Sequence, residues 1–512
     1  MARIILFRPI EFYSYRLALF RPPLGLLYLA AELKKNNFSV VVIDAFTSPD
    51  WETVLRRSLG SDTILAGVGV MTGYQIKGAL DFARIVKQSG SAPVVWGGLH
   101  ASLVPRQTID HELVDMVVIG EGEHKIVRLA TCLLKGGSLR EVPGIMFKHN
   151  GEIVSTSRAE GFIDMNRLPL PDYGQLNVDH YMQSEESLMG EGIRSLDLNT
   201  DRGCPYRCGF CYNLTYNHRK WRCMDAERVL ENASELTEKY HLTGINFVGD
   251  NFCVNPQRVR SICKGILERG LQLRWHMDIR IDTFLQLDDQ LLDLLKRSGC
   301  HRLTFGVESG SQRVLDYIKK DIRAEDVLKA HKRARSYGFA VSYHFMVGFP
   351  DETRKDILLT LRLIRRLLRN DDVQIFGPSI YVPYPGTPLY LRSIERGFIP
   401  PRSLESWIPY DWDTCPRYPW QSSAHRRHIR YAKFLVEQAA AERRQSRMGR
   451  IIKSFFRLRL SAYALGLTLT GLDIHLLMLL QTLWKLTLKR PRKWSCTPPG
   501  PSASTIGPAK NL

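Results

Sequence analysis

Three cysteines, Cys204, Cys208 and Cys211, lie within a stretch of eight residues. Three thiolates on one such loop can hold three irons of a cubic four-iron cluster and leave the fourth iron open to another ligand. A structural zinc site needs four protein ligands, so the zinc alternative would require completion by His218 or Cys223. The CxxxCxxC spacing therefore favours an iron–sulfur cluster over zinc.

The elements around these cysteines alternate between strand and helix patterns. The predicted strands are Ser195–Thr200, Ile245–Gly249, Leu273–Ile279, Leu303–Glu308, Ala340–Val347 and Gln374–Val382. The predicted helices between them are Ala226–Tyr240, Pro256–Arg269, Asp289–Ser298, Ala324–Tyr337 and Thr353–Arg369. This alternation is typical of a parallel sheet and predicts a partial (β/α)6 barrel of TIM type over residues 193–396, with the cysteine loop after its first strand.

Polar residues and a glycine follow four of these strands. Asp250 follows the second strand, Arg280 the third, Glu308 the fourth and Gly348 the fifth. The Arg280 guanidinium offers a fixed fork of donors that suits a carboxylate. Each residue alone could be an ordinary turn or surface charge, but their order behind the cysteines makes a chance arrangement improbable.

Taken together, these residues resemble the radical S-adenosylmethionine superfamily. The resemblance implies that the open iron chelates the amino and carboxylate groups of S-adenosylmethionine. It also implies that the segment at Asp250 holds the methionine amino group and that Arg280 binds the carboxylate. Glu308 would contact the ribose, the loop at Gly348 would approach the adenine, and the backbone of Phe210 would complete the site.

The first 145 residues show a second strand–helix alternation. Its predicted strands are Arg3–Phe7, Ser39–Asp44, Ile64–Val70, Val94–Trp96 and Met116–Ile119, with helices at Leu24–Asn36 and Gln75–Gln88. The pattern predicts a Rossmann-like, doubly wound parallel sheet. Glycine-rich loops follow two of the strands, at the carboxyl edge where such sheets bind ligands. Turn-rich residues 146–192 are predicted to be a linker.

A domain of this kind before the barrel resembles the cobalamin-binding subgroup of the superfamily, with matching segments at 22–29, 96–105 and 115–123. The resemblance implies a set of cobalamin contacts: Gly97, Gly98, His100, Gly120, Glu121 and Gly122. The sequence lacks the Asp-x-His-x-x-Gly motif of cobalamin mutases and has no histidine before His100. A cobalamin without a histidine lower ligand is therefore expected. The alternative is a Rossmann-like domain that binds no cofactor.

The resemblance implies an enzyme in which a one-electron reductant, such as flavodoxin or ferredoxin, drives cleavage of S-adenosylmethionine to a 5′-deoxyadenosyl radical. The leading hypothesis is methylation of an unactivated carbon in a small-molecule or lipid-like substrate, with cobalamin carrying the methyl group. Radical cyclisation or oxygenation without methyl transfer is the first alternative. A non-catalytic cobalamin or iron–sulfur sensor is the second.

The chain of 512 residues has a net charge of +19, and residues 421–493 carry much of it, with 16 Lys and Arg against three acids. Residues 397–496 are expected to form a basic, amphipathic helical region and 497–512 a disordered tail. The apolar stretch Leu460–Leu488 has Asp473 and His475 at its centre, which favours amphipathic helices on the barrel or on a membrane surface over a spanning helix. Few cysteines and no signal peptide indicate the cytoplasm, with peripheral membrane contact, and no nucleic-acid motif is visible.

Overall fold

The computed structural model describes residues 1–10, 21–90, 92–157, 161–369, 373–414, 416–441 and 447–467, without the side chains of 183–188 and 447–449. Residues Met1–Gly466 form one compact unit, and Leu467–Leu512 form a second, of which only Leu467 is described. The mixed α/β fold that the sequence predicts is confirmed, with two large sheets and one two-stranded sheet in the first unit, followed by C-terminal helices.

The N-terminal sheet has the strand order β2-β1-β3-β4-β5-β6-β7. Its strands are β1 (Arg3–Arg8), β2 (Ser39–Asp44), β3 (Thr63–Gly69), β4 (Val94–Gly97), β5 (Met116–Val118), β6 (Ile145–His149) and β7 (Glu152–Ser155). The helices are α1 (Leu24–Lys35), α2 (Trp51–Ser58), α3 (Gln75–Ser89), α4 (Gly98–Leu103), α5 (Pro105–Asp110) and α6 (Glu123–Lys135). β1 to β5 run parallel. They are almost entirely apolar and buried, as strands covered by helices on both faces must be.

The predicted linker begins with structure that belongs to this sheet. β6 runs antiparallel to β5, and β7 pairs with β6 through a two-residue turn at Asn150-Gly151. Both turn residues have positive φ angles, 52° and 79°. An Asn-Gly turn with two positive φ angles is the standard type I′ hairpin connection, so the signal was present in residues 146–192 but was interpreted as a linker. Helix α7 (Val178–Met189) also lies in that region.

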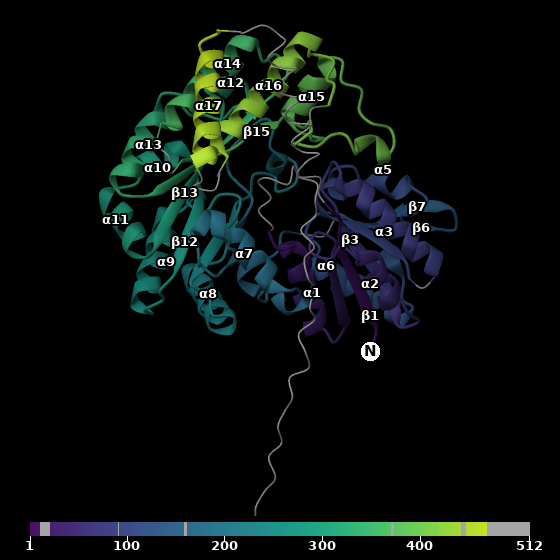
Figure 1. The fold of residues 1–512 in the computed structure, drawn as a ribbon. Helices are drawn as coiled ribbons and strands as arrows, with labels where there is room; N and C mark the ends of the chain where they lie inside the picture. The colour runs from purple at the N-terminus through teal and green to yellow at the C-terminus, as the bar shows by residue number, and fades with distance from the viewer. Residues whose placement is uncertain are drawn as a thin grey trace, which may run out of the picture. The chain divides into compact units, whose positions relative to one another are not determined.

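The second sheet confirms the predicted six-stranded partial barrel (Figure 1), with all neighbouring strands parallel and the order β15-β14-β13-β12-β11-β8. Its strands are β8 (Ser195–Asn199), β11 (Gly244–Val248), β12 (Arg274–Ile279), β13 (Cys300–Glu308), β14 (Ala340–Val347) and β15 (Val373–Ile380). The helices between them are α8 (Ala226–Tyr240), α9 (Pro256–Glu268), α10 (Ile281–Gln286), α11 (Asp289–Arg297), α12 (Gln312–Tyr317), α13 (Asp326–Ser336) and α14 (Arg354–Leu367). A small antiparallel pair, β9 (Asp201–Arg202) and β10 (Arg222–Cys223), brackets the cysteine loop. Short 3-10 helices are η1 (Leu139–Glu141), η2 (Met165–Arg167), η3 (Tyr173–Gln175), η4 (Tyr212–Leu214) and η5 (Glu405–Trp407).

Side-chain caps set the starts of the long barrel helices. Asp225 accepts a hydrogen bond from the Arg228 N–H at the start of α8, and Asn255 caps α9 ahead of Pro256. Thr353 and Asp356 form a reciprocal capping box on α14. Such caps satisfy backbone donors that the first helical turn leaves free, which is why the predicted starts of α8 and α9 agree with the structure.

Helix α15 (Pro388–Glu395) ends the predicted barrel region. The C-terminal region after it is helical, as predicted, with α16 (Ser423–Ala440) and α17 (Arg447–Ala464). Helix α16 packs on β15 and so covers an edge strand of the barrel sheet, while α17 packs on α14 and α16. The expected helices of 468–488 and the expected tail of 497–512 lie outside the described residues. No helix in the described part of the chain is long and apolar enough to cross a membrane.

Candidate functional site

The three cysteines lie on the loop that connects β9 to η4, beyond the carboxyl end of β8. Cys208 is buried, whereas Cys204 and Cys211 are partly accessible. The loop is fixed from both sides, because the Gly209 N–H donates to the Ile318 carbonyl at 2.8 Å and the Leu389 N–H donates to the Gly209 carbonyl at 3.0 Å. The backbone thus holds all three thiols on one short, immobilised segment, as a cluster with three cysteine ligands requires.

Two N–H donors approach these sulfurs. Asn251 Nδ2 lies 3.8 Å from Cys204 Sγ, and Arg280 Nη1 lies 3.8 Å from Cys208 Sγ. Donors to the sulfurs tune the potential of an iron–sulfur cluster, and no sequence pattern singles out Asn251 for this role. A mononuclear zinc centre needs several protein ligands around one ion. Among the described residues, no three His, Cys, Asp or Glu side chains are arranged in that way.

Asp250 lies directly above the cysteine loop. Its carboxylate accepts hydrogen bonds from the Gly203 N–H at 2.5 Å and from Asn213 Nδ2 at 2.9 Å. The preceding Gly249 is obligatory, since a Cβ there would lie 2.0 Å from a carboxylate oxygen of Asp201. Burial raises the pKa of Asp201 to about 6. Two carboxyl groups therefore lie at the end of β11, where only Asp250 was predicted.

Arg280 lies at the end of β12, but its fork is occupied within the chain. Nε and Nη2 each donate to Asp282 at 2.9 Å, and the guanidinium carbon lies 3.7 Å from the ring centre of Tyr206. The Arg280 guanidinium, which was expected to be open to a ligand carboxylate, thus binds the carboxylate of Asp282 instead. What remains directed at the cluster loop is Nη1, toward Cys208.

Glu308 ends β13 in a left-handed conformation, with a φ of 69°. Non-glycine residues in that region are strained and concentrate at functional sites. Its carboxylate forms a buried ion pair with Lys320 at 2.8 Å, in which both side chains are less than one tenth exposed. Burial opposes the charge of Lys320, but Glu308 raises its pKa above the usual value. Lys320 was not predicted, because it lies in the connection after α12 rather than at a strand end.

Gly348 opens the loop after β14 with a φ of 91°. Its carbonyl accepts from Trp420 Nε1 at 3.2 Å, and its N–H donates to Glu352 at 2.5 Å. Burial raises the pKa of Glu352 to about 8. The rings of Phe349 and Phe210 lie 5.9 Å apart, so this loop packs against the cysteine loop.

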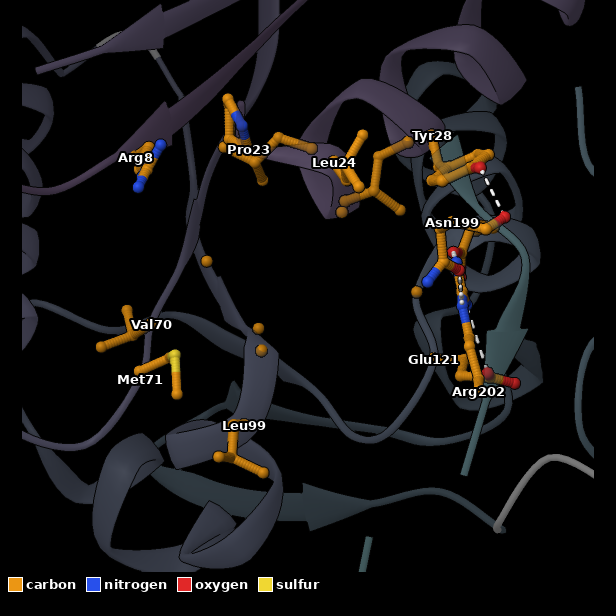
Figure 2. Close-up of a pocket in the computed structure, with 18 of the residues that line it drawn as sticks. Arg8, Pro23, Leu24, Tyr28, Val70, Met71, Leu99, Glu121, Asn199 and Arg202 are labelled. Atoms are coloured by element: carbon orange, nitrogen blue, oxygen red, sulfur yellow. Dashed lines mark hydrogen bonds and ion pairs between the residues drawn. The ribbon is translucent and has the colours of Figure 1, made fainter. Parts of the chain in front are cut away.

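A cavity of about 650 Å³ lies at the carboxyl edge of the N-terminal sheet (Figure 2). Leu24, Val70, Met71 and Leu99 give it an apolar wall, and Asn199, Glu121 and Arg202 give it a polar one. The lining continues onto the barrel, where it includes Asp250 and Tyr212, the residue after Cys211. One cavity therefore joins the glycine-rich edge of the N-terminal sheet to the cysteine loop.

Four of the expected contacts are glycines that line this cavity: Gly97, Gly98, Gly120 and Gly122. Gly98 has a φ of 86°, and a Cβ there would lie 2.7 Å from the Val70 nitrogen. A Cβ on Gly122 would lie 3.2 Å from Leu29. Glycine is therefore required at Gly98 by packing within the domain and is favoured at Gly122, and the backbone of both residues forms part of the cavity wall.

His100 is not among the lining residues, in contrast to the expectation. Helix α4 begins at Gly98 and turns His100 inward, where it is 1% exposed and bonds Thr72 through Nδ1 at 3.0 Å. Its ring meets Trp407 edge to face at 5.7 Å, and burial lowers its pKa to about 3. His100 is therefore a neutral residue of the domain core and does not form part of the cavity wall.

Glu121 lines the cavity and also joins the two sheets. It pairs with Arg202 at 3.1 Å and with Arg222 at 2.6 Å, the two arginines of the β9–β10 pair, and it accepts from the Ile163 N–H at 2.9 Å. Burial opposes its charge, but these partners hold the pKa of Glu121 below its usual value. A single carboxylate at the N-terminal sheet thus contacts both ends of the segment that carries the cysteines.

The inward face of the barrel strands is polar, with hydrogen-bonded side chains in a first layer. Asn246 bridges Asp197 and His276, and Ser342 bridges Arg302 and Gln374. One layer nearer the carboxyl ends, Asp278 and His344 alternate with buried apolar neighbours. Both are solvent-accessible, and each lies two residues after an inward-facing side chain, His276 or Ser342, so both face the barrel interior. Burial raises the pKa of Asp278 and lowers that of His344. The alternation of apolar and polar residues in Trp275–Arg280 was the signal that could have identified this face.

Comparisons with known proteins agree with this arrangement. Residues 198–364 match the model of the radical SAM superfamily, and residues 16–130 match that of the B12 binding domain. An uncharacterized methyltransferase of Pyrococcus horikoshii is 31% identical over 384 residues, which cover 74% of this chain and 80% of that protein.

The anaerobic magnesium-protoporphyrin IX monomethyl ester cyclase of Cereibacter sphaeroides is 27% identical over 379 residues, which cover 72% of this chain and 60% of the cyclase. The structure of OxsB, a cobalamin-dependent S-adenosylmethionine radical enzyme with aqua-cobalamin bound, shares the fold with a TM-score of 0.66 at 17% identity, covering 91% of this chain and 72% of OxsB.

Proposed function

The chain belongs to the cobalamin-dependent radical S-adenosylmethionine family, and from this premise we propose that it methylates an unactivated carbon of a small-molecule or lipid-like substrate. The observation that carries the proposal is the single cavity that runs from the glycine-lined sheet edge to the cysteine loop. When bound, the cluster supplies the electron that cleaves S-adenosylmethionine to the 5′-deoxyadenosyl radical, and cobalamin supplies the methyl group. The protein positions these groups and excludes water.

The proposed ligands are the residues that the family resemblance implies, without His100. Cys204, Cys208 and Cys211 hold three irons of the cluster. S-adenosylmethionine is bound by a set of strand-end residues and loop backbone: Phe210, Asp250, Arg280, Glu308 and Gly348. Cobalamin is bound at the sheet edge, without a histidine below the cobalt, by Gly97, Gly98, Gly120, Glu121 and Gly122. The engagement of Arg280 by Asp282 favours a role in which Arg280 orients the cysteine loop beside the ligand.

The substrate is proposed to enter the barrel above Asp278 and His344. These side chains face the interior, and no hydrogen bond from either is found among the described residues, whereas the layer below them is hydrogen-bonded. A substrate that displaces water from these accessible side chains should replace its hydrogen bonds, so the end that enters should carry hydrogen-bonding groups. The expected result for Asp278→Asn is that 5′-deoxyadenosine formation persists while methylated product is lost. Equal loss of both would contradict this placement.

Cyclisation or oxygenation without methyl transfer remains the alternative, and the cyclase relative supports it. Incubation with S-adenosylmethionine labelled in its methyl group distinguishes the two. Label in the product supports methyl transfer, whereas an unlabelled product with stoichiometric 5′-deoxyadenosine supports the alternative. The relatives are enzymes, so the sensor hypothesis is abandoned.

Two partners complete the proposal. A one-electron donor such as flavodoxin or ferredoxin would reduce the cluster, and the basic C-terminal region would contact an anionic membrane. The first test is purification without oxygen from cells supplied with cobalamin, followed by iron and cobalt analysis. About four irons and one cobalt per chain, with 5′-deoxyadenosine formed only in the presence of reductant, is the expected result. Iron without cobalt would exclude the cobalamin-dependent methyl transfer.

A further inference from the structure

Helix α17 leaves a row of large apolar side chains in solvent. Ile451, Phe455 and Leu458 are 56%, 46% and 70% exposed, and their spacing places them on one face of the helix. The opposite side, with Leu460 and Tyr463, is buried. A helix that only covers a barrel needs one apolar face, the buried one. The exposed apolar row is therefore a candidate surface for a further contact, with a partner or a membrane.

Basic residues flank this exposed row, and the sequence of α17 contains no Asp or Glu. At about 100° per residue, Arg450 and Arg457 lie beside the row, on the edge that faces α14. An apolar stripe next to a basic edge is the pattern of helices that lie in the plane of a membrane interface.

Between α14 and α17 lies a hollow of about 290 Å³, here called the arginine hollow, which is lined by Arg365, Leu368, Arg369, Arg457, Leu460 and Ser461. None of its lining residues is acidic. Nε of Arg365 is buried and has no hydrogen-bond partner among the described residues. No ion pair of Arg365 or Arg369 is found among the described residues, which do not include Asp371 and Asp372. Guanidinium groups around a small hollow suit a phosphate, which accepts several charge-assisted hydrogen bonds.

We propose that the arginine hollow binds the phosphate of an anionic lipid while the row Ile451, Phe455 and Leu458 enters the interfacial layer of the same membrane. The inference rests on the membrane contact proposed above and adds the lipid class and the residues that select it. Apolar burial and charge attraction act together here, and neither alone gives stable attachment to a bilayer.

The segment that follows α17 is a poorer occupant on grounds of charge. Residues 468–488, which follow α17 directly, contain a single acid, Asp473, and the basic residues Lys489, Arg490, Arg492 and Lys493 come next. One acid in such a segment could not neutralise both Arg365 and Arg369. An anionic membrane offers both negative charge and an apolar layer.

The test is sedimentation of the full-length holoenzyme with vesicles of phosphatidylcholine alone or with added phosphatidylglycerol. Binding is expected only with phosphatidylglycerol, and it should weaken as salt rises. The double variant Arg365→Ala/Arg369→Ala should bind at least roughly tenfold more weakly, because it loses both nearby charge and phosphate coordination. Arg366→Ala is the matched control, since Arg366 is exposed on the same helix but does not line the hollow.

The outcomes separate the two levels of the proposal. If the wild type does not bind phosphatidylglycerol vesicles, both the membrane contact and the lipid site are wrong. If it binds but the double variant binds no more weakly than Arg366→Ala, the membrane contact stands and the hollow is not its phosphate site. Phe455→Ser provides a second variant, which should weaken vesicle binding while 5′-deoxyadenosine formation and thermal unfolding stay unchanged. If inorganic phosphate binds at Arg365 but the protein does not bind vesicles, the lipid assignment is also wrong.

Discussion

The carboxyl edge of the N-terminal sheet and the mouth of the barrel form one cavity, but different kinds of chemical group line its two parts. The sheet edge presents glycine backbone and apolar walls, and its candidate contacts act through shape. The barrel mouth presents thiols, carboxylates and guanidinium groups, most of them already paired. A site made of side chains should fail when one group is removed, whereas a site made of backbone should fail when a group is added.

The largest effect is expected at the barrel mouth. Cys208→Ala removes one of the three thiols that are proposed to hold the cluster on the immobilised loop. Cluster iron should be lost and reductant-dependent 5′-deoxyadenosine should fall to background, as measured by iron analysis and chromatography. Cys132→Ala, on α6, is the control and should behave as the wild type. Retention of activity in Cys208→Ala would show that the loop does not carry the cluster.

The converse change at the sheet edge is addition at Gly25. This residue lines the cavity from α1, and a Cβ there would meet no atom within 4 Å. Gly25→Leu should therefore project into the cavity and weaken cobalamin binding by roughly tenfold or more, the effect of about 1–3 kcal/mol of overpacking. The free protein should be no less stable, because leucine favours a helix over glycine by roughly 0.8 kcal/mol.

Gly25→Ala supplies the matched control for that substitution. It makes the same gain in helix propensity but adds a single carbon to the cavity. Cobalamin titration of both variants, with thermal unfolding of the free proteins, gives the comparison. Equal affinity for cobalamin in the alanine and leucine variants would mean that the ligand does not occupy the space beside α1.

These two predictions also show why the two regions differed in how well the sequence described them. The cysteines and the six barrel strands follow from local pattern, and the structure confirms the strands. At the sheet edge, the glycines were identifiable, but the direction of His100 depends on where α4 begins, which sequence proximity to Gly97 and Gly98 does not determine. The partners of Glu121 lie 81 and 101 residues away, so no local pattern could indicate them.

Glu121 lies where the two regions meet, and an intermediate effect is expected from Glu121→Gln. Removing one partner from a buried ion network costs up to about 3–5 kcal/mol. Arg222 would lose its counter-charge, whereas Arg202 would keep Glu123. Since Glu121 is less than one tenth exposed, little of this cost is screened by solvent. The variant should unfold at lower denaturant concentration and bind cobalamin several-fold more weakly. Glu152→Gln, an exposed residue on β7, is the control.

The pH dependence of stability gives a second measurement on the same residue. Because the pKa of Glu121 is lower in the folded protein than in the unfolded chain, its contribution is fully present above the unfolded value of 4.5 and is lost as the pH falls through the folded value. The difference in unfolding free energy between wild type and Glu121→Gln should therefore shrink from pH 7 toward pH 3. A difference that does not change with pH would mean that the network does not depend on the charge of Glu121.

The smallest effect on cofactor binding is expected at His100, although it lies beside two cavity glycines in the sequence. His100→Leu should leave the affinity for cobalamin within about twofold, because the side chain does not line the cavity and faces Thr72 and Trp407 instead. Stability should fall by about 1–3 kcal/mol, since Thr72 loses its buried hydrogen-bond partner. The pKa of about 3 keeps the imidazole neutral throughout the physiological range, so the spectrum of bound cobalamin should not change between pH 6 and 8 through this residue. A large loss of affinity for cobalamin in His100→Leu, with unchanged stability, would mean that His100 contacts the cofactor. It would contradict the division between a sheet edge lined by backbone and a barrel mouth lined by side chains.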